Sequence, residues 1–191
     1  DITPPHVVSV FPDSILKNPK GEAKNSVIQI SFNEPIDPSG VQGDFKIVDK
    51  QTYFALDKNQ VFLKSDKSTQ PVGTFNLVNN YQTLEFTPSK ECGKNACGNP
   101  IYCLPVCDTA GANCKNDDYQ ILFKAAKTLA GSFESQPFSG VADLAGNALD
   151  GNNDGSAQTA TTTLPVFDKW KMPDNYYWTF KIKDEIDSTS P

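Results

Sequence analysis

The sequence predicts an all-β protein built as a two-sheet antiparallel sandwich. Three observations lead to this prediction: short segments with apolar residues at every second position, turn-forming Pro, Gly and Asn between them, and almost no apolar repeat of helical period. A period of two places alternate side chains on opposite faces of a strand. Seven or more such segments, separated by turns, are typical of a sandwich whose inner faces share one core.

The clearest strand is predicted within residues 26–37, SVIQISFNEPID. Ile28, Ile30 and Phe32 point to one face, and the residues between them point to the other. The alternation stops at Asn33-Glu34-Pro35, because proline has no N–H to donate to a β-ladder. We therefore expect this segment to be a central core strand around which the other strands assemble.

The segments on either side follow shorter patterns. Residues 1–5 form a proline-rich lead-in that favours an extended backbone, and residues 6–11 form a short edge strand that Pro12 ends. A polar loop at residues 13–25 precedes the core strand. The further predicted strands are, in chain order, 45–48, 53–56, 61–63, 74–78, 83–87, 119–125 and 176–182.

Two pairs of these segments are predicted to form hairpins. Residues 74–78 and 83–87 have matching apolar positions, and Asn79-Asn80 between them tolerates the positive φ that a tight turn needs. Residues 53–56 and 61–63 could pair in the same way across the polar stretch that separates them.

The chain is expected to form a single sandwich domain over residues 1–186, with residues 187–191 as a linker to a next repeat. Such a sandwich needs about 100 residues, and no break in composition divides the 191 residues, so the surplus is placed in long loops. These are a cysteine-rich insertion loop at 89–117, a turn-rich segment at 141–155 and a crossing loop at 156–174. The motifs DITPP and DSTSP at the two ends favour one unit of a tandem array.

Charge and hydropathy argue against two classes of partner. The net charge is −6, the pI is about 4.7, and all 17 basic residues are lysine. Arginine reads phosphates and base edges in two-point contacts, so its absence from an acidic chain argues against nucleic acid as a partner. No apolar run reaches the roughly 20 residues that span a bilayer, so we expect no membrane span in this chain. The start at Asp1 indicates a mature or excised piece whose export signal lies elsewhere.

Five cysteines fall within 23 residues: Cys92, Cys97, Cys103, Cys107 and Cys114. Such a cluster is either a disulfide-stapled loop or a metal site. A zinc site would need thiolates in a near-tetrahedral arrangement, whereas disulfides suit an extracytoplasmic domain, and we predict disulfides. Because five is odd, one thiol is left free or pairs with another chain. The sequence does not decide which cysteines pair.

Four segments resemble the bacterial Ig-like domains of S-layer and other cell-surface proteins. TPPHVVSVFP, from residue 3, resembles that family's proline-led first strand, and VIQISFNEPIDPSGV, from residue 27, resembles its second strand and the following turn. VADLAGNAL, from residue 141, resembles the turn before its last strand, which follows here as YYWTFKI from residue 176. The cysteine-rich insertion departs from the family pattern.

The resemblance implies an immunoglobulin-like antiparallel sandwich of about seven to nine strands with long loop insertions. It also implies an extracellular location, secreted or on the bacterial cell surface. The expected function is that of a structural module, a tandem repeat or assembly unit of a surface layer, stalk or filament. Its partners would be neighbouring Ig-like repeats or identical subunits. The alternative is an adhesive or carbohydrate-binding module that recognises a surface glycan or protein ligand through its loops.

No pattern in the chain indicates catalysis, and we expect no enzyme. His6 is the single histidine, and no serine lies in a nucleophile elbow. The carboxylate pairs Asp117-Asp118 and Asp184-Glu185 have the character of solvated loop charges, with no groove of aromatic residues beside them.

One segment suggests a cofactor, which is calcium. Oxygen-bearing side chains at alternate positions, followed by Gly155, are how a short loop begins to wrap a hard cation. The candidate ligands are Asp150, Asn152 and Asp154, with Asp143 and Asn147 as further candidates. An EF-hand loop that starts at Asp150 would need glutamate at position twelve, where the chain has Thr161. The alternative is a turn in which Asx side chains bond their own backbone.

Overall fold

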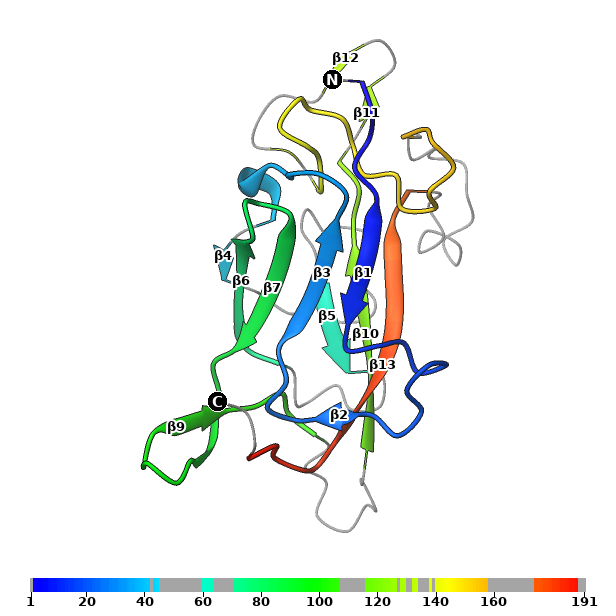
Figure 1. Cartoon of the computed structure of the whole chain (residues 1–191). Helices are drawn as coiled ribbons and strands as arrows, with labels where there is room; N and C mark the ends of the chain where they lie inside the picture. The colour runs from blue at the N-terminus through cyan, green and yellow to red at the C-terminus, as the bar shows by residue number, and fades with distance from the viewer. Residues whose placement is uncertain are drawn as a thin grey trace.

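The computed structural model is that of an all-β protein (Figure 1). Its regular structure, in the part of the chain that it describes, consists of strands and one short 3-10 turn, η1 (Pro38–Gly40). The described residues are 2–41, 43–44, 60–63, 71–106, 116–126, 128–129, 132–133, 138, 140–157 and 174–188.

The larger sheet has five strands in the order β1-β3-β7-β6-β4, all antiparallel. Their bounds are β1 Val7–Phe11, β3 Ile28–Phe32, β7 Thr83–Pro88, β6 Gly73–Val78 and β4 Gly43–Asp44. β3 pairs with β1 on one side and β7 on the other, so the predicted core strand lies inside the sheet and the predicted edge strand lies at its edge. β6 and β7 form the predicted hairpin, with positive φ at Asn79 and Asn80.

The second sheet has four strands in the order β2-β13-β10-β5. Their bounds are β2 Glu22–Ala23, β13 Tyr176–Lys183, β10 Asn116–Phe123 and β5 Gln60–Leu63. β10 lies antiparallel to both β13 and β5, whereas β2 runs parallel to the end of β13. β5 therefore pairs with β10. Its predicted hairpin partner at 53–56 lies outside the described residues, as do the predicted strand at 45–48 and residues 158–173 of the crossing loop.

The core lies between the inner faces of the two sheets. Ile28, Ile30 and Phe32 are each at most 4% exposed, which confirms the inward face predicted for this strand. Across the core, Phe75 of β6 meets Phe123 of β10 edge-on, with ring centroids 6.1 Å apart. The buried residues of the main cluster on β10 and β13 are Tyr119, Ile121, Phe123, Trp178, Phe180 and Ile182. Burial of this apolar surface is the main stabilising contribution to the fold.

Two segments predicted as loops contain short strands. The stretch at 13–25 includes β2, and the cysteine-rich stretch at 89–117 includes the hairpin of β8 (Glu91–Lys94) and β9 (Pro100–Tyr102). A further small hairpin is formed by β11 (Thr128–Leu129) and β12 (Ser132–Phe133). The sequence did not predict these elements because their few residues show no clear apolar alternation.

The two termini lie at opposite ends of the sandwich (Figure 1). We call the end where residues 2–6 lead into β1 the N-terminal end; the turns at 33–37 and 141–155 are also found there. We call the end where residues 184–188 follow β13 the C-terminal end; β2 and the β8–β9 hairpin are also found there.

Candidate functional site

The first candidate region is a turn at the N-terminal end that joins Asp143 to Asn147. The Asp143 carboxylate accepts hydrogen bonds from the backbone N–H and the side-chain Nδ2 of Asn147, both at 2.7 Å. The Asp143 N–H donates in return to the Asn147 carbonyl at 2.9 Å. Asp143 is 2% exposed and Asn147 is 7% exposed. These bonds satisfy the buried carboxylate from within the turn itself.

The second candidate region is the loop that begins at Asp150. Asp150 is buried, and its two carboxylate oxygens accept the N–H groups of Asp154 and Gly155, at 3.1 and 2.7 Å. Asn152 accepts the Asp154 N–H and donates its side-chain amide to the Asp154 carboxylate. Asp154 also accepts the N–H of Ser156 at 3.1 Å. The loop is thus a series of Asx turns in which side-chain oxygens bond nearby backbone donors.

Both turns also hold the N-terminal segment of the chain. The Asp150 N–H donates to the Pro5 carbonyl at 2.8 Å, whereas the His6 N–H donates at 2.6 Å to the side chain of Asn33, which belongs to the separate turn at 33–37. The Asn147 side chain contacts the Thr3 carbonyl at 3.4 Å. Two of the residues proposed from the sequence as calcium ligands, Asn147 and Asp150, therefore bond the backbone of Thr3 and Pro5.

The side chains of the two turns are not arranged as a cluster of metal ligands. Over the residues that the structure describes, no group of three or more His, Cys, Asp or Glu side chains is arranged to hold a metal ion. The donor types still suit calcium, and a carboxylate oxygen that accepts one N–H keeps a further lone pair. Calcium binding by Asp150, Asn152 and Asp154, with or without Asp143 and Asn147, remains a prediction.

The third candidate region is the β8–β9 hairpin of the cysteine-rich insertion, which lies at the C-terminal end of the sandwich (Figure 1). Cys92 of β8 and Cys103, just after β9, form a disulfide with a Cα–Cα distance of 5.7 Å. Cys97 lies at the tip of the hairpin as an exposed free thiol. Cys107 and Cys114 lie outside the described residues. Because Cys92 and Cys103 are oxidised to a disulfide, these two sulfurs are not thiolate ligands for zinc.

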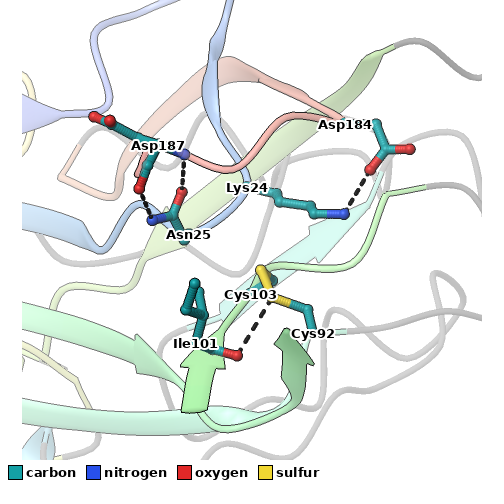
Figure 2. Close-up of a disulfide and its surroundings, with 7 residues drawn as sticks. All are labelled: Lys24, Asn25, Cys92, Ile101, Cys103, Asp184 and Asp187. Carbon is teal, nitrogen blue, oxygen red and sulfur yellow. Dashed lines mark hydrogen bonds and ion pairs between the residues drawn. A yellow bond between two sulfur atoms is a disulfide. The ribbon is translucent and has the colours of Figure 1, made fainter. Parts of the chain in front are cut away.

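Residues that the sequence did not single out gather next to this disulfide. Lys24 forms an ion pair with Asp184 at 2.7 Å, and Asn25 exchanges two hydrogen bonds with the backbone of Asp187 (Figure 2). No local pattern could reveal these pairs, because about 160 residues separate the partners.

The comparisons with known proteins fit this architecture. The family model of the bacterial Ig-like domain matches residues 1–97, just over half of the chain. This chain belongs to the bacterial Ig-like domain family. The matched part of the Ig-like domain contains all five strands of the larger sheet, whereas β10 and β13 of the second sheet follow it. No curated protein and no solved structure matches the chain.

Membership of the family bears on location and activity. Bacterial Ig-like domains are typically modules of surface proteins and usually non-catalytic. The Cys92–Cys103 disulfide points to the same kind of compartment, because disulfides persist in oxidising surroundings outside the cytoplasm. Among the described residues of this Ig-like domain, no helix is long and apolar enough to cross a membrane.

Proposed function

We propose that this Ig-like domain is a non-catalytic structural module of a secreted bacterial cell-surface protein, acting as a tandem repeat or assembly unit. The observation that carries the proposal is the placement of the two terminal segments. Residues 3–6 are bonded to the turns at the N-terminal end, and residues 184–187 are bonded to residues 24–25 at the opposite end. A module held in this way separates whatever it connects by the length of the sandwich.

The strands that carry the terminal segments also suit a spacer. Residues 2–6 lead directly into β1, and residues 184–188 follow directly from β13. β1 and β13 belong to different sheets, which share one core. Tension between the two ends would therefore pass from one sheet to the other through the packed core and would act along the strands. The force that the domain withstands would be set by its barrier to unfolding.

Size-exclusion chromatography and electron microscopy of the purified chain test this proposal, without reductant and both with and without calcium. Filaments or ordered sheets would show that the chain has its own assembly interface and would support the proposal directly. A compact monomer in both conditions would restrict the proposal to a passive repeat.

A glycan-binding screen then separates the structural module from the alternative. Saturable binding of one surface glycan, lost on substitution of exposed loop residues, would overturn the structural proposal in favour of an adhesive or carbohydrate-binding module. Absence of binding, in a monomer that resists unfolding under load, is the result that we expect from a spacer.

A further inference from the structure

The segment by which the chain leaves the sandwich lies against residues 24–25 (Figure 2). β2 runs parallel to the end of β13, with Glu22 opposite Ile182 and Ala23 opposite Lys183. The chain then turns, with the Ser26 N–H donating to the Ala23 carbonyl at 3.1 Å. This pairing and turn bring residues 24–25 alongside residues 184–187.

Four polar contacts join the two stretches. The Lys24 N–H donates to the Glu185 carbonyl at 2.9 Å, and the Lys24 Nζ pairs with the Asp184 carboxylate at 2.7 Å. Asn25 Nδ2 donates to the Asp187 carbonyl at 2.9 Å, and the Asp187 N–H donates to Asn25 Oδ1 at 2.8 Å. The Asn25 side chain thus bonds both backbone groups of Asp187, as a neighbouring strand would. Contacts at the surface contribute little stability by themselves. They therefore hold the segment only while residues 24–25 stay in place.

The disulfide-closed hairpin supports residues 24–25 from the other side. Leu104 is fully buried, and its N–H donates to the Lys24 carbonyl at 2.7 Å. The neighbouring Cys103 donates its N–H to the Lys90 carbonyl and is linked through its sulfur to Cys92. Gly93 of β8 also lies near the segment, because a Cβ added at this position would be 3.6 Å from Ile186 Cδ1.

We infer that the Cys92–Cys103 disulfide braces the C-terminal segment through Lys24 and Asn25, and so fixes the direction in which the chain leaves the sandwich. Closing the hairpin with a disulfide reduces the number of open conformations available to it. Leu104 therefore stays against Lys24, which in turn keeps Lys24 and Asn25 in position for residues 184–187. This role assigns a structural purpose to the cysteine-rich insertion. This inference does not depend on the proposed function, because it concerns only contacts within the domain.

Hydrogen exchange of single amides, followed by NMR on the full chain, tests the inference. In the double variant Cys92→Ala/Cys103→Ala, we expect the amides of Lys24, Leu104 and Asp187 to exchange about tenfold faster, while the core amides of Phe180 and Ile121 keep their rates. The matched control is Cys97→Ala, which removes an exposed thiol of the same hairpin and should leave all five amides unchanged. Unchanged exchange at Lys24 and Asp187 in the double variant would overturn the inference, and so would an equal acceleration of every amide.

A second experiment keeps both cysteines, weakens the contacts of the C-terminal segment and measures the effect on the disulfide. Coupling between two sites is reciprocal in free energy: if the disulfide stabilises the C-terminal segment, the bonded segment stabilises the disulfide to the same extent. In Asn25→Ala, we expect the equilibrium with a small dithiol, which gives two protein thiols and one oxidised dithiol, to lie several-fold further toward the reduced protein than in the wild type. Asn18→Ala is the control, because it removes a side-chain bond to Glu22 of β2 at the same end, and that bond does not involve residues 184–187. Equal equilibrium constants for reduction in Asn25→Ala and the wild type would overturn the inference.

Discussion

Asn147 donates both its backbone N–H and its side-chain amide to the carboxylate of Asp143, each at 2.7 Å, and both residues are buried. This two-point bond closes the turn that follows Val141, and the adjacent backbone extends it. Asp143 bridges to Ile36, and the Asp37 N–H donates to the Ala142 carbonyl at 2.8 Å. The turn is thus built into the sandwich and does not hang from it as a free loop.

Asp143→Ala should destabilise the fold by about 3 kcal/mol, because it leaves two buried N–H donors of Asn147 without their acceptor. Urea denaturation measures this change through the midpoint at constant m-value. Asp154→Ala is the matched control, since the Asp154 carboxylate also accepts a backbone N–H and a side-chain amide but is exposed, and it should cost less than about 1 kcal/mol. Equal losses in the two variants would contradict the role that we assign to burial.

The calcium prediction for the 150–155 loop has a direct thermal test. The Asp150 oxygens already accept the N–H groups of Asp154 and Gly155, so we expect the loop to hold its shape without an ion. A melting temperature that is the same in chelator and in millimolar calcium would therefore contradict the calcium prediction and leave the loop as a series of Asx turns. A rise of several degrees in calcium, lost in Asp150→Asn, would instead establish the ion site, since a ligand that binds only the folded state stabilises it by mass action.

Tyr176 should make stability fall at high pH. Partial burial raises its pKa above the ordinary value of 10.0, because desolvation disfavours the phenolate. At a pH between the unfolded and folded pKa values, the folded state binds more protons than the unfolded state, so the free energy of unfolding decreases as pH rises above about 10. Urea midpoints of wild type and Tyr176→Phe between pH 8 and 11 measure this.

The comparison with Tyr176→Phe isolates this tyrosine from the other ionisable groups of the protein. We expect the wild type to lose more stability above pH 10 than the variant does. Parallel curves for the two proteins would show that burial of the phenol does not couple its ionisation to folding.

Gly73 is expected to tolerate no side chain. A Cβ at this position would collide with the Thr87 carbonyl and the Phe86 ring of the neighbouring strand β7. Gly73→Ala should therefore cost about 2 kcal/mol or more through overpacking. The matched control is Gly93→Ala, also in a strand, where the added Cβ would make an ordinary contact with Ile186, so its effect should stay within about 0.5 kcal/mol. Chemical denaturation of both variants compares the two losses, and a tolerated Gly73→Ala would be inconsistent with this packing.

Much of the fold was predictable because it rests on local alternation. Ile28, Ile30 and Phe32 share a face in the sequence pattern and share the core in the structure. The hairpin of β6 and β7 followed in the same way from two matched apolar patterns joined by Asn79-Asn80. A period of two is a property of the strand itself, so it shows in the sequence before any partner is known.

The candidate site was harder to predict, because its chemistry depends on contacts that the local sequence pattern does not reveal. The sequence predicted turns around Asp143 and Asp150, but not that both carboxylates would be buried. It predicted disulfides in the insertion, but left the pairing open, which the 5.7 Å approach of the Cys92 and Cys103 Cα atoms decides. The sequence contained no pattern that predicts the hydrogen bonds between Asn25 and Asp187.

By itself, then, the sequence determined the sandwich class, the main strands, the acidic arginine-free surface and the likeness to bacterial Ig-like domains. These follow from side-chain period and composition, which are local. The tertiary structure alone decided which strands pair, that β2 runs parallel to β13, and that the insertion supports the C-terminal segment. These depend on contacts between residues far apart in the chain, which become favourable only when the shared core brings the two sheets together.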